Sequence, residues 1–308
     1  MKQLVKRCKR TLLRGINALG YAVYKLPPRP SSSSRIKSIA LGGRTIRIYS
    51  GNPLCHAYQQ NPQYNFTIGV VAAMVQKRFP DAWAVDVGAN VGDTLAIIKS
   101  NAAAMPVICI EGDPICFELL QDNARQFEAV FPVKAFLSDQ PGTARVECHK
   151  AGWNTTLTEA GSDGRGQPLE FQTLDQVVER LNGHHRVKLL KVDTEGYDIR
   201  ILRGAARILG RHRPVITFEL NRENVEPLGD SVGDFIDYLV NSGYGHFILN
   251  DSEGRFICAL NGKDKAALLD LYQYSNLGRP IYYYDIWVFH LSDGDLFEDF
   301  LAQERARS

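Results

Sequence analysis

The sequence predicts an α/β protein with an open, mostly parallel sheet that carries helices on both faces. Strand-length apolar runs alternate with helix-like segments, which is the pattern of βαβ units. The first run, Trp83 to Val87, ends in an Asp-x-Gly-x-x-x-Gly turn and leads into a helix that begins near Leu95. The later runs Val107 to Ile110 and Val187 to Val192 also end beside acidic residues. Sheets of this class bind ligands at the carboxyl ends of their strands, so these polar residues indicate a site.

A basic amphipathic helix is predicted for residues 1–25, ahead of the sheet. The first 80 residues contain no Asp or Glu but hold 14 of the 36 Lys and Arg residues. At about 100° per residue one arc of the helix is basic and the other is apolar, and the apolar arc consists of Leu4, Val5, Cys8, Leu12, Ile16 and Leu19. We expect residues 2–25 to contact an anionic membrane surface. Packing on the protein's own domain or on a partner stays open, and nucleic acid ranks lower because no nucleic-acid-binding module accompanies the charge.

The predicted location is cytoplasmic, with a peripheral place at the inner membrane surface as a further expectation. The N-terminal helix is too short and too charged to span a membrane, and it lacks the apolar stretch of a secretory signal. The six cysteines form no C-x-x-C pair and no zinc-like spacing. That usage of cysteine favours a reduced compartment.

A linker and one domain follow the helix. Residues 26–34 combine prolines with four serines, which stiffen the segment and give it nothing to bury. We expect a single domain over 35–308. Its N-terminal part, 35–81, holds a hairpin around a Gly-Gly turn and a helix. The remainder, 82–308, is the α/β core, with an insertion at about 142–172.

The turn after the first strand selects the type of ligand. A dinucleotide fingerprint that starts at Gly88 would need glycine where Asn90 and Asp93 stand. Acidic residues on both sides of the glycines repel phosphate but suit a ligand that carries an ammonium group and a sulfonium. We therefore predict S-adenosylmethionine, with Asp86, Gly88, Asn90 and Gly92 as cofactor-binding residues. A tight turn without a ligand is the structural alternative.

The ends of the second and third strands predict the rest of the cofactor site. Glu111 follows the second strand, where a carboxylate can accept from both ribose hydroxyls of an adenosyl ligand. Asp113, just before a proline, is predicted to cap the next helix. The third strand, predicted over Val133 to Leu137, ends in Ser138 and Asp139, which could bond the adenine amino group. The same two residues are also ordinary turn formers.

The fourth and fifth strands deliver carboxylates to one edge of the sheet. Asp193 and Glu195 follow the fourth strand, and Glu219 and Asn221 follow the fifth. Methyl transfer to a hydroxyl needs an aligned acceptor oxygen and a group that accepts its proton. We predict Asp193 and Glu195 as catalytic residues, and Glu219 and Asn221 as substrate-binding residues. Helix capping and an ion pair with Lys191 are the structural alternatives.

Two features of the site stay open at this level. Asp193, Glu219 and Asn221 supply hard oxygen ligands that could hold a divalent cation such as magnesium, and nothing in the sequence decides whether they do. In the insertion, Trp153 and Asn154 could pack on a sugar or an adenine ring, whereas a tryptophan that only covers the core is the alternative.

The paired motifs resemble those of FkbM-type methyltransferases. The resemblance rests on Asp86 to Gly92, Lys191 to Asp198, Gly204-Ala205 and Pro214 to Glu219, within a stretch from about Ala82 to Asn221. It implies a class I, Rossmann-like methyltransferase fold with a seven-stranded sheet whose last strand is antiparallel. His246 to Asn250 and Asp285 to His290 would supply the sixth and seventh strands.

The resemblance also implies a function. We expect an S-adenosylmethionine-dependent O-methyltransferase that acts on a sugar hydroxyl of a polysaccharide, a glycolipid or a natural product. A membrane-associated protein that binds the cofactor without turnover is an alternative, and a nicotinamide-dependent oxidoreductase is a weaker one. The family usually has an aliphatic residue at the position of Thr194 and a glutamate at the position of Asp198, which leaves the identity of the acceptor open.

Overall fold

The computed structural model describes most of the chain from residue 35 onwards. The described ranges are 35–50, 52–61, 63–151, 154–159, 166–182, 185–275 and 281–307. The helix predicted for 1–25 and the linker predicted for 26–34 lie outside the described residues, so both remain predictions. Within the described ranges, no helix is both long enough and apolar enough to cross a bilayer.

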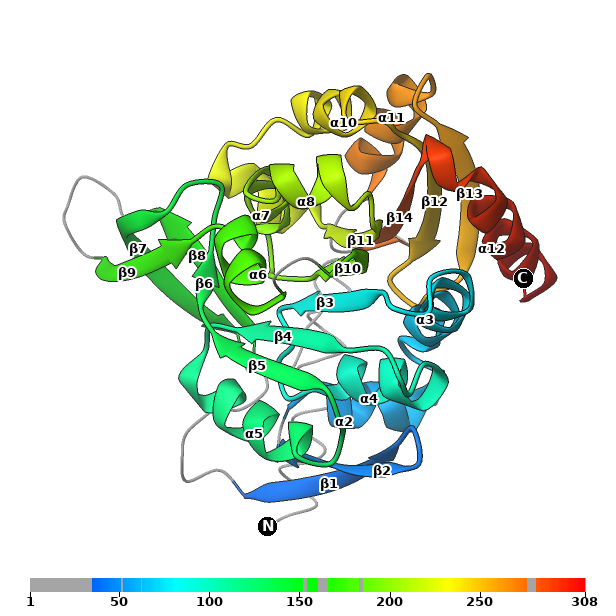
Figure 1. Cartoon of the computed structure of the whole chain (residues 1–308). Helices are drawn as coiled ribbons and strands as arrows, with labels where there is room; N and C mark the ends of the chain where they lie inside the picture. Colours follow the sequence, from blue (N-terminus) through cyan, green and yellow to red (C-terminus); the bar gives the residue numbers. More distant parts are fainter. Residues whose placement is uncertain are drawn as a thin grey trace, which may run out of the picture.

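A mixed eight-stranded sheet forms the centre of the molecule (Figure 1). Its strand order is β13-β12-β14-β11-β10-β3-β4-β5. The strands are β3 (Trp83–Val87), β4 (Val107–Glu111), β5 (Val130–Lys134), β10 (Val187–Val192), β11 (Val215–Leu220), β12 (Tyr244–Asp251), β13 (Phe256–Asn261) and β14 (Tyr284–His290). The five strands from β5 to β11 are parallel, and β14 is antiparallel to both of its neighbours. This is the class I methyltransferase topology, including the antiparallel last strand.

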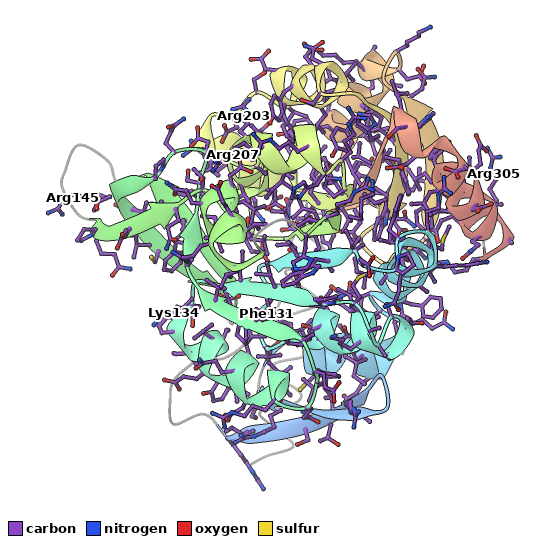
Figure 2. The ribbon with its side chains drawn as sticks, in the orientation of Figure 1. Phe131, Lys134, Arg145, Arg203, Arg207 and Arg305 are labelled. Atoms are coloured by element: carbon purple, nitrogen blue, oxygen red, sulfur yellow. The ribbon has the colours of Figure 1, made fainter. Side chains whose placement is uncertain are left out.

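Two strands differ from the prediction. The sheet has eight strands and not seven, because β13 pairs antiparallel with β12 and extends that edge. The third strand, β5, starts at Val130 and ends at Lys134, so it lies three residues earlier than predicted. Pro132 within it is compatible with a strand because β5 is at the edge of the sheet, where a backbone donor can be missing. Figure 2 labels Phe131 and Lys134 on this strand.

Helices cover both faces of the sheet and bury its alternating side chains. One face packs against α6 (Leu174–Asn182), α7 (Asp198–Arg203), α8 (Ala206–Arg211) and α10 (Val232–Asn241). The other packs against α3 (Phe66–Arg78), α4 (Asp93–Asn101) and α12 (Gly294–Arg307). In β3, Val85 and Val87 belong to the first cluster and Ala84 to the second, as the two-residue period of a strand requires. The other helices are α2 (Leu54–Gln60), α5 (Pro114–Ala124), α9 (Arg222–Val225) and α11 (Lys265–Tyr274), with short 3-10 turns η1 (Glu226–Leu228) and η2 (Leu291–Asp293).

Local sequence signals explain where two of these helices begin and end. Asp113 caps α5 as predicted, because its side chain accepts from the backbone amides of Ile115 and Cys116 at 2.8 and 3.2 Å. The helix predicted after the fourth strand is instead two helices, α7 and α8, which separate at Gly204. A Cβ at Gly204 would collide with the carbonyl oxygen of Ser138, so the close packing at this break requires glycine.

The predicted N-terminal hairpin is present as β1 (Ile36–Leu41) and β2 (Arg44–Tyr49), joined at Gly42-Gly43. It lies against α4 and α5 (Figure 1). Asn123 of α5 fastens it by donating to the carbonyl oxygen of Arg47 at 2.8 Å. The hairpin therefore covers one side of the turn that follows β3.

The insertion forms a sheet of its own, seen in green beside α6 in Figure 1. Its order is β6-β9-β7-β8, made of β6 (Phe136–Leu137), β9 (Gln167–Gln172), β7 (Gly142–Ala151) and β8 (Asn154–Glu159). The chain enters this sheet directly after β5. This small sheet therefore borders the carboxyl edge of the main sheet.

Candidate functional site

The sheet register gathers polar side chains of four strands at one edge. Lys191 on β10 is opposite Asp86 on β3, and Glu219 on β11 is opposite Asp285 on β14. Asp193 follows directly after β10, and its backbone amide donates to the carbonyl oxygen of Val87 at 3.1 Å. Carboxylates that are far apart in the sequence are thus brought side by side.

A cavity of about 340 Å³ opens over this edge, within the size range of small-molecule sites. It extends from Glu111 and Phe136 at one end to the carboxylates at the ends of β10 and β11 at the other. Seven of the predicted site residues line it: Gly88, Asn90, Glu111, Asp193, Glu195, Glu219 and Asn221. The wall also contains residues that the sequence analysis did not assign to the site: Tyr64, Asp93, Lys191, Tyr282, Tyr283 and Asp285.

The turn after β3 lets its backbone lie close to the backbone that follows β10. Gly88 has a φ of 74°, and a Cβ there would collide with the carbonyl oxygen of Asp193, so only glycine fits. Asn90 also has a positive φ, 46°. Its side-chain oxygen is buried and has no hydrogen-bond partner within the described residues. An unused acceptor in the cavity wall suits a ligand that donates hydrogen bonds.

Glu111 is held in place by two backbone amides. Asn90 donates to its Oε2 at 2.9 Å and Asp113 to its Oε1 at 2.7 Å. Each carboxylate oxygen can still accept a further bond from the cavity side. Burial raises the pKa of Glu111 to about 7, although the two amides oppose the rise. Two donors from a ligand would favour its charged form.

Phe136 provides a flat surface beside Glu111. A Cβ at Gly112 would lie 2.5 Å from the Phe136 ring, so this glycine lets the ring pack against the end of β4. Ser138 and Asp139, the predicted adenine contacts, do not line the cavity. Ser138 is instead bound to Gln172 of the small sheet through its backbone, because the chain leaves β5 at Lys134 and turns away.

Asp86 and Gly92 lie behind the cavity wall. Asp86 is fully buried, and the Lys191 Nζ lies 3.3 Å from its Oδ1 and 3.3 Å from the Oδ2 of Asp193. Asp86 therefore positions Lys191, which does line the cavity. Gly92 has a φ of 87° and begins α4, where a Cβ would lie 3.1 Å from Leu120. Both residues shape the site without facing the cavity.

The far end of the cavity has an excess of acidic groups. Burial and the nearby Asp193 raise the pKa of Glu195 and that of Asp285, each to about 7. Burial, Glu195 and Asp193 also raise the pKa of Glu219 well above its usual value. Lys191 is the only Lys or Arg among the described residues of this wall. These carboxyl groups therefore lie close together in a poorly solvated place, where Lys191 offsets only part of their mutual repulsion.

The predicted substrate-binding residues are only partly placed. Asn221 caps α9, since its Oδ1 accepts from the backbone amide of Glu223 at 3.1 Å. Trp153 lies outside the described residues. Asn154 begins β8 and is paired with Ala151 through the backbone. From β8 it is Leu157 that reaches the cavity wall.

A metal site receives no support from the described part of the chain. No group of three or more His, Cys, Asp or Glu residues there is arranged to hold an ion. Of the three residues proposed as ligands, Asn221 is occupied as a helix cap and Asp193 pairs with Lys191.

The comparison with protein families decides the assignment. Residues 86–245, just over half of the chain, match the methyltransferase FkbM domain. The chain belongs to the FkbM methyltransferase family. The match contains the end of β3 and the whole of β4, β10 and β11, which are the strands that build the cavity. A search of curated proteins found no match to the chain.

Solved structures with similar folds are distant in sequence. Methyltransferase FkbM from Methylobacillus flagellatus KT is 18% identical, with a TM-score of 0.42, and the match covers 59% of this chain and 43% of that one. Precorrin-6y C5,15-methyltransferase from Geobacter metallireducens GS-15 is 13% identical, with a TM-score of 0.35, over 72% of this chain and 87% of that one. The plantazolicin methyltransferase BamL, solved in complex with a triazolic desmethylPZN analog and SAH, is 8% identical, with a TM-score of 0.41, over 77% and 89%. The first match spans less than half of that protein's length.

The two departures from the usual FkbM signature contact each other. Thr194 donates to the Oδ2 of Asp198 through its backbone amide at 3.0 Å and through its hydroxyl at 2.8 Å. The backbone amide of Glu219 donates to the other carboxylate oxygen of Asp198 at 3.3 Å. Thr194 and Asp198 together fix the turn that carries Asp193 and Glu195, where Glu195 has a φ of 54°.

Proposed function

We propose that this FkbM-family protein is an S-adenosylmethionine-dependent O-methyltransferase that acts on a sugar hydroxyl of a polysaccharide, a glycolipid or a natural product. The observation that carries the proposal is one cavity with a carboxylate suited to a ribose, Glu111, at one end and, at the other, several carboxylates that share one cation, Lys191. The S-adenosylmethionine donor has hydroxyls for the first end and a sulfonium charge for the second.

The donor fits the residues that line the cavity. Glu111 would accept from the two ribose hydroxyls, and Phe136 would lie against the adenine ring. The unpartnered oxygen of Asn90 and the bare backbone at Gly88, which carries no side chain between the turn and the cavity, suit the segment between ribose and sulfur. The sulfonium charge would lie near Asp193, whose neighbours already show raised pKa values.

The chemistry needs one positioned hydroxyl and one proton acceptor. A bound sulfonium donor supplies an electrophilic methyl group. Asp193, held by Lys191 at 3.3 Å, orients the acceptor hydroxyl. Glu195 accepts the proton of that hydroxyl, because burial and its acidic neighbour raise its pKa to about 7, close to a working pH. Asn224 keeps Glu195 in position by donating to its Oε2 at 2.9 Å.

Peripheral membrane contact is part of the proposal. The basic segment 2–25 would hold the protein near an anionic surface, where the sugar of a glycolipid would be within reach. That segment lies outside the described residues, so its pattern of charge is the support for this part.

Calorimetry with two variants tests the donor site. Wild-type protein should bind S-adenosylmethionine and S-adenosylhomocysteine. Gly88→Val should abolish binding, because the side chain would need the space of the Asp193 backbone. Asp193→Asn should keep most of the affinity and lose turnover. Absence of donor binding by folded wild-type protein would overturn the proposal.

A further inference from the structure

A second cavity adjoins the first across the carboxylate cluster. Its volume is about 450 Å³. The two cavities share one wall, which consists of Tyr64, Asn65, Thr94, Lys191, Asp193, Glu219 and Asp285. Glu111 and Phe136, at the adenosyl end of the first cavity, do not line the second. The second cavity therefore lies beyond the reactive end of the proposed donor site.

One buried side chain that lines the second cavity has an unused hydrogen-bond acceptor. Asn250 on β12 is 1% exposed, and its Nδ2 donates to Glu304 of α12 and to the carbonyl oxygen of Gly254. Its Oδ1 has no hydrogen-bond partner among the described residues. A buried acceptor without a partner costs free energy unless a ligand supplies a donor. Asn250 is paired in register with Asp285, so this acceptor lies next to the carboxylate wall.

Much of the remaining lining suits a ligand with many hydroxyl groups. It combines amides and hydroxyls with aromatic surfaces, from Asn61, Gln63, Asn65, Thr67, Thr217, Tyr64, Phe256 and Trp287. Three charged residues, Glu253, Arg255 and Arg307, also line the cavity and can bond hydroxyl groups. Thr217 and Trp287 face each other in register on β11 and β14, so a polar and an aromatic group stand side by side. Amides and hydroxyls both donate and accept hydrogen bonds, which matches the hydroxyls of a sugar ring.

We propose that the second cavity binds the sugar unit that carries the methylated hydroxyl. This inference rests on the proposed function, and it adds where the acceptor lies. Displacement requires the acceptor oxygen to approach the methyl carbon from the side opposite the leaving sulfur. A sugar in the second cavity presents a hydroxyl to Asp193, Glu219 and Asp285 from that side. Its neighbouring hydroxyl donates to the Oδ1 of Asn250.

Two variants of the second cavity test this placement. Thr217→Val removes one hydroxyl at nearly constant volume, and Gln63→Trp places a bulky ring at the exposed rim. Lys77→Trp is the matched control, because it adds the same ring to an exposed position at the other end of α3, away from both cavities. Circular dichroism and thermal melts would first establish that all three variants fold.

The assay measures methyl transfer and donor binding separately. Polysaccharide and lipid fractions of the host are incubated with S-adenosylmethionine labelled in the methyl group, and rates are measured against the amount of fraction. Both cavity variants should raise the half-saturating amount of the fraction at least about tenfold, which corresponds to a loss of roughly 1.4 kcal/mol of acceptor-binding free energy. The donor Kd should be unchanged. Lys77→Trp should behave like wild type.

Three other outcomes are distinguishable. If the variants transfer methyl groups with unchanged half-saturation, the acceptor does not use the second cavity, while the proposed function stands. If the donor Kd rises by the same factor as the half-saturating amount of the fraction, the second cavity belongs to the donor site and the inference is wrong. If folded wild-type protein binds the donor but labels no fraction, both the inference and the transferase proposal are overturned.

Discussion

Two lysines on the same strand, β10, show how structural and functional charge differ in this fold. Lys188 is 1% exposed, and its Nζ lies 2.7 Å from Asp293 and 2.6 Å from the carbonyl oxygen of Arg213. Burial lowers its pKa, and the single acid opposes this effect. For Lys191, burial would also lower the pKa, but the attraction of Asp193, Asp86 and Asp93 outweighs it and raises the pKa.

The difference lies in the balance of charge around each lysine. Lys188 forms a matched pair that closes one end of the sheet. At the other end, Lys191 is outnumbered by carboxylates, several of which have raised pKa values. A fold gains nothing from excess charge of one sign, so we interpret the excess as a site preorganised for a cation.

The largest expected effect is a loss of turnover, and it comes from a change among the carboxylates around Lys191. Glu195→Gln should reduce turnover by about 10²- to 10⁴-fold, because it removes the proton acceptor. Donor affinity above pH 7 should also fall, because the variant lacks one of the carboxylates that favour the sulfonium, but by much less than turnover. In wild type the rate should rise as the pH passes about 7, where Glu195 loses its proton. The variant should lose this rise, and a pH profile identical to that of wild type would assign the base elsewhere.

Loss of the Lys188–Asp293 pair should lower the stability of the protein and leave the rate of methyl transfer unchanged. Lys188→Met leaves Asp293 buried without its cation, which should lower the free energy of unfolding by about 3 to 5 kcal/mol. The double variant Lys188→Met with Asp293→Leu should recover most of that loss, since it removes both charges. Chemical denaturation measures both values. A single variant as stable as wild type would show that the pair is not structural.

Removing one acid from the excess should make the protein more stable. The folded protein holds a proton on Asp285 up to about pH 7, whereas the unfolded chain releases it near pH 4, so this group costs stability as the pH rises through that window. Asp285→Asn should therefore raise the melting temperature at pH 8 by roughly 2 to 4 °C, the shift produced by about 1 kcal/mol.

The same variant provides its own control. At about pH 3.5, where Asp285 is mostly protonated in both the folded and the unfolded protein, melting of the variant and of wild type should nearly coincide. Donor affinity should fall at pH 8 despite the gain in stability. Equal melting temperatures at both pH values would contradict the assigned charge excess.

Deletion of residues 2–25 should have the smallest effect on the surroundings of Lys188 and Lys191, because neither residue lies in the deleted segment. The truncated protein should keep its melting temperature and its donor affinity. It should no longer float with anionic vesicles, because the basic segment is gone. Flotation that is unchanged by the deletion would overturn the proposed membrane contact.

The strand pattern was the most predictable feature of the fold. β3 was predicted with its observed bounds and β10 with its observed start, because each is a buried apolar run that ends at a turn or an acid. β5 was misplaced because Pro132 suggests a break, and only its edge position explains why the residue is tolerated. β13 was missed, although the turn at Gly254 followed by an apolar run was a usable signal.

The site was predictable where a residue lies at or just after the carboxyl end of a parallel strand. Glu111, Asp193, Glu195 and Glu219 all lie in the cavity wall for this reason. Asp285 was missed because it begins an antiparallel strand, and its position depends on pairing between β11 and β14. Its neighbours Tyr282 and Tyr283 carry no signature of a site in the sequence.

The central claim is that the cavity carries negative charge awaiting a cation. Calorimetry of S-adenosylmethionine binding between pH 6 and 7.5, in buffers of different ionisation enthalpy, tests it directly. Because a sulfonium favours the ionised forms of Glu195 and Asp285, whose pKa values are about 7, binding should release protons and tighten as the pH rises. S-adenosylhomocysteine, which has the same tail without the sulfonium charge, should release fewer. Binding that is independent of pH, with equal proton release for both ligands, would contradict the account.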